Sequence, residues 1–301
     1  NVQDRRMDMN GKTDISDMIQ TMDSGDARYP ELLKEIRDYP NILYYIGDAG
    51  ILKKKKAAIV GSRKTTMYGR KVAASVAEDI SSVGICVVSG MAYGIDSCAH
   101  EGALKGEGST VAVLGCGVDI CYPRSNIELK RNIEKKGLII SEYPPGTRPE
   151  KYRFPQRNRI ISGISELTVV VQAGIKSGAL ITADCAAEQG RDVYAVPANI
   201  DSEYSLGSNK LIKDGAIPLI NAGEVLEAMG VGISDPSKIR EKLSETEKNI
   251  YDMVYSQGEL TADDISRRLD MDSGRVNGIV AVMEMKGVVF SAMGKIFIAK
   301  I

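Results

Sequence analysis

Short apolar runs alternate with amphipathic segments over most of this chain, and the alternation begins at residue 57. The runs are rich in β-branched residues and span residues 57–60, 85–89, 110–114, 138–141, 167–172, 192–196 and 216–220. Segments with helical periodicity lie between them, among them residues 71–82, 125–135 and 179–189. Strands that are apolar on both faces and alternate with helices are typical of a parallel sheet covered on both sides. The pattern therefore predicts an α/β fold, a doubly wound parallel sheet over residues 51–230.

The two ends of the chain have a different pattern. Residues 1–50 begin with a polar stretch, and residues 29–36 favour a short amphipathic helix that ends at Tyr39-Pro40. We interpret this part as a lead-in and not as a domain. Residues 231–243 contain Gly232, Asp235-Pro236 and mixed charges, and this composition predicts a linker.

Residues 244–301 predict a second domain, a winged helix-turn-helix. A helix is expected over residues 245–255, a second opens at the N-cap Thr261, and a third runs from Ser273 to Lys286, before a hairpin. The third helix would be the one that reads DNA, but its only cations are Arg275 and Lys286. Major-groove readers place several cationic or amide side chains on that helix. We therefore favour a protein-interaction or stabilising role over duplex readout.

Composition excludes several classes of protein. The 301 residues are 43% hydrophobic, and 39 Lys and Arg oppose 40 Asp and Glu, so a polyanion would have to be held by a local basic patch. No apolar run is long enough for a membrane span and residues 1–10 lack a signal-peptide core, which predicts a cytoplasmic protein without a membrane partner. With scattered cysteines and His100 as the only histidine, we expect no metal site and no catalytic triad. The chain does not begin with methionine, so we expect that an N-terminal element is missing.

The loop after the first expected strand is a candidate phosphate site. Gly61-Ser62-Arg63 follows the apolar run, and a helical pattern starts a few residues later at Tyr68. A glycine turn between a strand and a helix can present backbone N–H groups and a cation to a phosphate. The loop is neither of the two commonest nucleotide-binding motifs. A tight turn with a solvated arginine is the alternative.

Other loops that follow expected strands carry further candidates. Tyr122-Pro123-Arg124 supplies a second cation, and Lys176-Ser177 precedes another expected helix start, where an anion could bind. Asp96 and His100 also follow a strand, but for them we favour capping and packing.

The segment between residues 143 and 159 is the most basic part of the sequence. Its cations face one acid, Glu150, and are interleaved with the aromatic residues Tyr152 and Phe154. The cations are Arg148, Lys151, Arg153, Arg157 and Arg159. Cations that follow a backbone and aromatic rings that stack on bases are the components of a single-strand platform, with stacking worth roughly 1–3 kcal/mol per base. A charged surface loop with two core aromatics is the alternative.

Parallel strands bring their carboxyl ends to one edge of a sheet. The cations after the strands should therefore form one basic rim, made of Arg63, Arg124, Arg157, Arg159 and Lys176. A mononucleotide needs only two or three cations, so this number favours an extended phosphate chain.

Several ordered motifs together resemble the DprA/Smf family of DNA-processing proteins. They are Gly61-Ser62-Arg63 with Tyr68-Gly69, Ser89-Gly90-Met91-Ala92 with Gly94-Ile95-Asp96 and Ala99-His100, Tyr122-Pro123, Phe154-Pro155 with Arg157-Asn158-Arg159-Ile160-Ile161-Ser162-Gly163, and Ser177-Gly178-Ala179-Leu180-Ile181-Thr182-Ala183. The resemblance extends from about residue 29 to residue 229.

The resemblance implies an extended Rossmann fold that binds single-stranded DNA, protects incoming DNA, dimerises and loads the RecA recombinase during natural transformation. It implies no enzymatic activity and no cofactor, and only some members have a winged helix. The helical N-terminal domain of relatives would be reduced here to the lead-in. Carried over by position, the implied DNA-binding residues are Gly61, Ser62, Arg63, Arg124, Phe154, Arg157, Asn158, Arg159, Lys176 and Ser177.

Two other functions stay open from the sequence. The fold class also resembles nucleotide phosphoribohydrolases, which need a glutamate soon after a threonine, but here the only local substitute after Thr182 is Asp184. A regulator that reads duplex DNA through the winged helix is the third possibility. For a homodimer we expect residues 216–229 to form the interface, because a sheet edge offers unpaired backbone and apolar surface.

Overall fold

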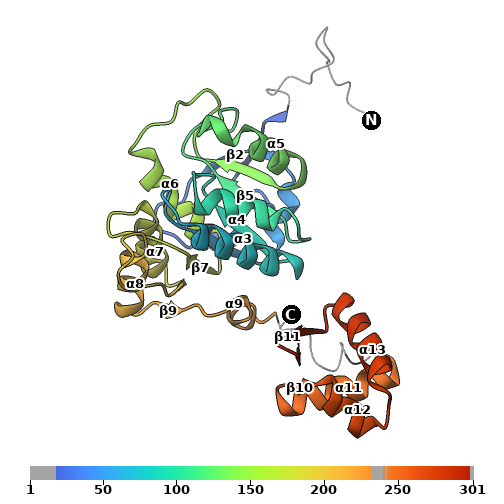
Figure 1. Ribbon diagram of the computed structural model, residues 1–301. Helices are drawn as coiled ribbons and strands as arrows, with labels where there is room; N and C mark the ends of the chain where they lie inside the picture. Colours follow the sequence, from blue (N-terminus) through green and yellow to red (C-terminus); the bar gives the residue numbers. More distant parts are fainter. Residues whose placement is uncertain (1–17, 232–239, 241–242, 299–301) are drawn as a thin grey trace, which may run out of the picture. The chain divides into compact units, whose positions relative to one another are not determined.

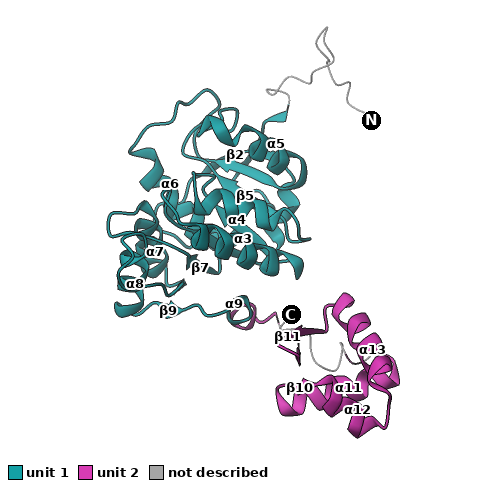
Figure 2. Cartoon of the chain, in the orientation of Figure 1, with its two compact units in different colours: residues 1–225 teal, residues 226–301 magenta. Residues whose placement is uncertain are grey.

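The computed structural model describes residues 18–231, 240 and 243–298 of the chain. The chain divides into two compact units, residues 1–225 and residues 226–301 (Figure 2). The division falls inside the helix α9 (Ala222–Ala228) and not at residue 230. Most of the expected linker, residues 232–239 and 241–242, lies outside the described residues, as do residues 1–17 of the expected lead-in.

The first unit is built on a nine-stranded sheet with the strand order β1-β2-β6-β5-β4-β3-β7-β8-β9. All pairs from β6 to β9 are parallel, whereas β1 pairs with β2, and β2 with β6, in the antiparallel direction. The strands are β1 (Gln20–Asp23), β2 (Ile42–Gly47), β3 (Lys56–Val60), β4 (Cys86–Ser89), β5 (Thr110–Val113), β6 (Leu138–Ser141), β7 (Leu167–Val170), β8 (Asp192–Ala195) and β9 (Ile217–Pro218). The predicted α/β fold with a mostly parallel sheet is confirmed.

The central strands are buried along their whole length. Every residue of β3, β4, β5, β6 and β7 is buried, which is the environment that their uniformly apolar sequences require. The helices are α2 (Glu31–Lys34), α3 (Met67–Ser82), α4 (Ile95–Ala103), α5 (Ile127–Lys136), α6 (Arg153–Gly163), α7 (Gly178–Glu188) and α8 (Leu206–Lys213), with 3-10 turns η1 (Ala49–Lys53) and η2 (Arg124–Asn126).

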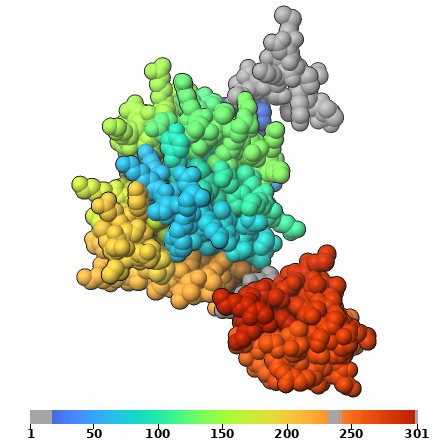
Figure 3. All heavy atoms as spheres, in the orientation of Figure 1, coloured from blue at the N-terminus to red at the C-terminus, as the bar shows by residue number. Residues whose placement is uncertain are grey.

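Two helix pairs cover the sheet. Helix α3 packs against α4, and α6 packs against α7 (Figure 1). The α3–α4 approach is close, because a Cβ atom at Gly102 would lie 2.2 Å from the Ala74 carbonyl oxygen. The space-filling view shows the blue segment that contains α3 at the surface of the first unit (Figure 3).

The N-terminal segment differs from the expected lead-in. Its two strands belong to the main sheet, and its helix α2 has only four residues. The apolar side chains of β2 explain this, because Leu43, Tyr45 and Ile46 are buried against the rest of the sheet. Residues 20–47 therefore extend the sheet of the first unit, and their derivation from a helical domain stays a prediction.

Between residues 243 and 298 the second unit contains three helices and a small antiparallel sheet. The elements are α11 (Glu245–Gln257), β10 (Leu260–Thr261), α12 (Ala262–Leu269), α13 (Ser273–Met285), β11 (Val289–Ala292) and β12 (Lys295–Ile298), and the strand order is β10-β12-β11. Thr261 caps α12, as predicted, and its partner in the capping box is Asp264. Helix α13 is capped by Asp272, one residue before the predicted start. Ile250, Val276 and Met283 lie in the core of this unit.

Candidate nucleic-acid interface

The strand order defines a topological switch point between β3 and β7. From β3 the chain moves through β4 and β5 to β6 on one side, and then returns to β7 on the other side of β3. In open α/β sheets, ligands bind beyond the carboxyl ends of the strands at such a point. The residues there are Gly61 after β3 and Gln172 after β7.

Gln172 fixes the loop that connects β3 to α3. Its side chain is buried, and its Oε1 accepts hydrogen bonds from Thr65 Oγ1 (2.8 Å) and from the Thr66 backbone N–H (2.9 Å). Its Nε2 donates to Ser205 Oγ at 3.1 Å. The Ser62 N–H donates to the Gln172 carbonyl oxygen at 2.7 Å. The loop is therefore held in one shape by residues of its own chain.

Backbone donors in this loop are already used. The Asp96 carboxylate, which is buried at the start of α4, accepts hydrogen bonds from the backbone N–H groups of Gly61 and Ala92. Burial raises the pKa of Asp96, while the nearby Arg157 guanidinium and these hydrogen bonds lower it. Because the N–H groups of both Gly61 and Ser62 have internal partners, these two backbone donors are not free for a phosphate. The side chains of Ser62 and Arg63 remain as candidate contacts.

Gly61 is required by close packing and not by an unusual dihedral angle. A Cβ atom at this position would lie 2.5 Å from Ile95 Cγ1 and 2.7 Å from Ile95 Cβ. Such distances are too short for any side chain to be accepted without a shift of α4.

Three side chains from different loops form a stack at this edge. The Arg63 guanidinium carbon lies over the Phe154 ring, 5.3 Å from its centroid, and the Tyr122 ring stacks on Phe154 with centroids 5.3 Å apart and planes at 28°. Arg63 follows β3, Tyr122 lies in the loop after β5, and Phe154 is in the first turn of α6. Arg63 and Tyr122 are exposed, whereas Phe154 is half-buried. The arrangement offers a cation and an aromatic surface together.

Arg157 lies in the core and not on the predicted rim. Only 3% of the residue is exposed, and its guanidinium donates to the carbonyl oxygens of Gly90 (2.9 Å) and Val113. Burial lowers the pKa of Arg157 to about 10, and the Asp96 carboxylate partly offsets that effect. The expectation failed because residues 153–163 form α6 and not a loop, so that Arg157 points under the strand ends.

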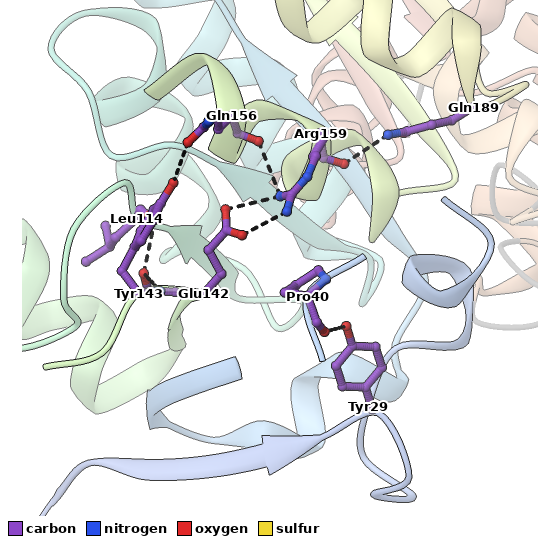
Figure 4. A network of polar contacts seen from close by, with 9 residues as sticks. Tyr29, Pro40, Leu114, Glu142, Tyr143, Gln156, Arg159 and Gln189 are labelled. Carbon is purple, nitrogen blue, oxygen red and sulfur yellow. Dashed lines mark hydrogen bonds and ion pairs between the residues drawn. The ribbon is translucent and has the colours of Figure 1, made fainter. Parts of the chain in front are cut away.

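Arg159 is neutralised by an acid. Its two terminal nitrogens donate to both oxygens of Glu142, at 3.1 and 2.8 Å, as Figure 4 shows. Both side chains are largely buried, with 23% and 16% exposed. In the same view, the Arg159 carbonyl oxygen accepts a hydrogen bond from Gln189. A paired guanidinium of this kind is a weaker phosphate site than a free one.

A comparison with known families identifies the fold. The family model for DNA recombination-mediator protein A matches residues 20–230 of the chain. The chain belongs to this family. DNA processing protein DprA of Bacillus subtilis is 42% identical over 212 residues, which cover 70% of this chain and 71% of the relative.

Two solved structures of the family resemble the chain. DNA processing protein A from Streptococcus pneumoniae is 40% identical, with a TM-score of 0.67 over 71% of this chain and 76% of that one. The protein from Helicobacter pylori, whose structure concerns its single-stranded DNA binding mode, is 30% identical, with a TM-score of 0.64 over 70% of this chain and 95% of that one.

The remaining predicted site residues fall into two groups. Arg124, the first residue of η2, and Lys176, before α7, are exposed, and within the described ranges neither they nor Arg63 form an ion pair. Ser177 caps α7, and Asn158 is buried with its amide donating to the Gly178 carbonyl oxygen at 3.2 Å. The exposed cations Arg63, Arg124 and Lys176 are thus the ones available to a ligand.

His100 has the packing role that we favoured. Its Nε2 accepts a hydrogen bond from the Met91 N–H at 3.2 Å, so its Nδ1 carries the proton and donates to Thr110 Oγ1 at 2.7 Å. Burial lowers the pKa of His100 to about 3. Within the part of the chain that the structure describes, no group of His, Cys, Asp and Glu could hold a metal ion. No helix in that part has the length and apolar character that a membrane crossing needs.

Proposed function

We propose that this chain binds single-stranded DNA along the carboxyl edge of its sheet, protects incoming DNA and loads RecA recombinase in natural transformation. The observation that carries the DNA-binding part is the stack of Arg63, Phe154 and Tyr122 beside the switch point. The relative from Helicobacter pylori, which shares the fold and 30% of its residues, supports the choice of single-stranded DNA. RecA as the partner, and natural transformation as the setting, rest on the resemblance to the family.

Charge supports a ligand that carries several phosphates. The chain has a net charge of −1, yet three exposed cations follow β3, β5 and β7 and form no ion pair with any acid that the structure describes. Aromatic surface beside such cations suits the alternating bases and phosphates of a single strand. The contacts proposed for DNA are made by the side chains of Ser62, Arg63, Arg124, Lys176 and Ser177, while Arg157 and Asn158 support the site from inside.

We propose no catalytic role and no cofactor. A phosphoribohydrolase needs a carboxylate at the glycosidic carbon, but Asp184 is exposed on α7 and Asp96 is buried with its oxygens facing backbone N–H groups. Release of a free base from nucleoside monophosphates by the purified protein would favour the enzyme instead.

The test is a binding titration with labelled oligonucleotides of increasing length. Arg63→Ala should weaken binding to every sequence alike and reduce the salt dependence, with the slope of log K against log salt falling by about 0.7 for one lost phosphate contact. Lys105→Ala is the matched control. Lys105 is an exposed cation that follows α4, at the opposite edge of the sheet, and it pairs with Glu78 of α3. Equal affinity for a mononucleotide and a long strand would overturn the proposal.

For the second unit we propose a winged-helix domain that does not read duplex DNA. The cation Lys286 at the end of α13 donates to Glu247 at 2.7 Å, which leaves Arg275 as the cation of that helix that is not ion-paired among the described residues. A chain that ends at residue 230 should therefore bind duplex DNA no differently from the full chain in a gel shift. Loss of binding to one duplex sequence on truncation would instead favour a transcription regulator.

A homodimer and a cytoplasmic location complete the proposal. Residues 216–229 are the proposed interface, and among them Ile217 and Ile220 are exposed apolar side chains, with 79% of Ile220 accessible. Light scattering at micromolar concentration tests the dimer, and a monomer would remove this part of the proposal.

A further inference from the structure

Lysines gather at the amino edge of the sheet, opposite the edge that carries the proposed single-strand site. Strand β2 ends at this edge, where Gly47 pairs with the first residue of β6, and the chain then passes through η1 to the start of β3. Four consecutive lysines, Lys53–Lys56, lead from η1 into β3. Lys135 and Lys136 end α5, directly before β6. Two groups of lysines therefore lie at the amino ends of the strands.

Hydrogen bonds join the loops that carry these two groups. The loop between α4 and β5 lies between them in the order of the strands. On one side of it, Ser109 Oγ donates to the Lys136 carbonyl oxygen. On the other side, Lys54 Nζ donates to the Glu107 carbonyl oxygen at 2.7 Å. The lysines therefore belong to one continuous surface, which we call the amino-edge strip.

Two lysines of the consecutive run fix its shape. Lys56 is buried, and its Nζ donates to the carbonyl oxygens of Leu52 (2.9 Å) and Lys54 (2.6 Å). Lys54 is itself held by the loop before β5. The exposed lysines of the strip that form no ion pair within the described ranges are Lys53, Lys135 and Lys136. Their ammonium groups are available to a ligand.

Three acids lie on the same edge, and two of them already have other partners. The Asp48 carboxylate accepts a hydrogen bond from the Gly50 N–H at 2.8 Å and so caps η1. Glu166 is half-buried, and its charge acts on the buried Lys56, whose pKa it raises against the larger, opposite effect of burial. Glu107 is exposed. The strip therefore keeps an excess of positive charge on a chain whose net charge is only −1.

The length and composition of the strip fit the backbone of duplex DNA. Three strand intervals separate β6 from β3, so the two ends of the strip lie about 14 Å apart. A duplex carries one negative charge about every 1.7 Å along its axis, twice the density of a single strand, so charge alone favours the duplex. Residues 48–56, 104–109 and 134–137 include no aromatic residue, so a single strand would gain no stacking here.

We propose that the amino-edge strip is a second DNA-binding surface, on which Lys53, Lys135 and Lys136 contact the phosphates of a duplex without reading its sequence. This inference goes beyond the proposed single-strand site and does not depend on it, because the two surfaces lie at opposite edges of the sheet and share no residue. One chain could then hold a duplex and a single strand at the same time.

An acidic peptide is the alternative ligand. A hollow of about 420 Å³ adjoins the run of four lysines, and Pro30, Leu32 and Leu52 in its lining could receive an apolar side chain. The hollow lies only at the β3 end of the strip. A peptide bound there would leave Lys135 and Lys136, at the β6 end, without a role. The extent of the strip therefore favours DNA.

The test is a titration of the full chain with a labelled duplex of mixed sequence at several salt concentrations. The strip variant combines Lys53→Gln, Lys135→Gln and Lys136→Gln. The slope of log K against log salt should become shallower by about 2.7, at about 0.9 for each of the three lost phosphate contacts. An unchanged slope would overturn the inference, as would a wild-type chain that does not bind the duplex at low salt.

The matched control changes the net charge by the same amount. It combines Lys105→Gln, Lys210→Gln and Lys248→Gln, and each of these lysines already pairs with an acid. The control should keep a slope close to that of the wild type. If the control and the strip variant lose the same slope, total charge and not this surface governs duplex binding, and the inference is wrong.

Simultaneous binding separates this inference from the proposed function. Saturation with oligothymidylate should leave the duplex bound, the strip variant should bind oligothymidylate like the wild type, and Arg63→Ala should leave the duplex slope unchanged. If oligothymidylate displaces the duplex, both share one site, and the inference is wrong while single-strand binding stands. A chain that binds the duplex through the strip but does not bind oligothymidylate refutes the proposed function instead.

A labelled oligoglutamate tests the alternative ligand. We expect the strip variant to lose much more affinity for the duplex than for this peptide. If the strip variant loses oligoglutamate binding and keeps the duplex affinity of the wild type, the strip binds an acidic protein and the inference is overturned.

Discussion

Arg157 offers the sharpest distinction between what the sequence motif and the structure predict. The motif groups Arg157 with Arg159 as two DNA contacts, but the structure places the first guanidinium in the core and the second in a partly exposed ion pair. Replacement of each by alanine should therefore have different consequences. Arg157→Ala should act mainly on stability, because it removes the group that ties α6 to the ends of β4 and β5.

The magnitude follows from the contacts that are lost. Arg157 donates to two buried carbonyl oxygens, and each hydrogen bond from a charged group is worth about 1.5–3 kcal/mol. Its removal also takes away a guanidinium that lowers the pKa of the buried Asp96 carboxylate. Two such hydrogen bonds together predict a loss of about 3–6 kcal/mol in the free energy of unfolding, a large part of the roughly 5–15 kcal/mol typical of a domain.

Urea unfolding followed by far-ultraviolet circular dichroism measures this loss. Arg159→Ala is the control on the same helix, and we expect it to cost less, about 1–3 kcal/mol, because the ion pair with Glu142 that it removes is more exposed than the contacts of Arg157. If Arg157→Ala unfolds at the same urea concentration as Arg159→Ala, or if it keeps full stability and loses only DNA affinity, the structural assignment of Arg157 is refuted.

Two further predictions concern residues around the same loop. Gly61→Ala should destabilise the first unit by about 1–3 kcal/mol through the contact with Ile95, whereas Gly178→Ala, whose added Cβ meets nothing within 4 Å, should be close to neutral in the same unfolding assay. Equal effects of the two substitutions would contradict the packing argument. Burial lowers the pKa of His100 to about 3 in the folded chain, compared with about 6.5 in the unfolded chain. The unfolded state therefore binds more protons, and the free energy of unfolding should fall as the pH drops from 6.5 toward 3. The free energy of unfolding should decrease by up to about 1.4 kcal/mol per pH unit, and His100→Gln should remove this pH dependence. If the variant keeps the pH dependence of the wild type between pH 7 and 5.5, another group is responsible.

Periodicity predicted the central sheet well. The predicted boundaries of β3 to β8 lie within two residues of the observed ones. These runs are short and mostly apolar, which indicates a buried strand. Strand β2 was missed although its residues Ile42 to Ile46 are apolar, aromatic and of the kind that strands favour.

The site was harder to predict because its geometry depends on contacts far apart in sequence. Helix α6 was taken for a loop because Pro155 and its many cations suggest one, although proline is tolerated in a first helical turn. The backbone donors of Gly61 and Ser62 seemed free because their acceptors, Asp96 and Gln172, come much later in the chain. A glycine-rich turn in sequence cannot reveal which of its N–H groups are already occupied.

The ends of the sheet restrict how copies of this chain can associate. Strand β9 has only two residues, and one of them is Pro218, which has no N–H to donate to a neighbouring strand. Extension of the sheet from one molecule into the next is therefore disfavoured at this side, although we expected unpaired backbone to drive dimer formation there. Self-association through this region would instead depend on side chains such as Ile217 and Ile220, and substitution of these isoleucines by charged residues would dissociate it without disturbing the strand order.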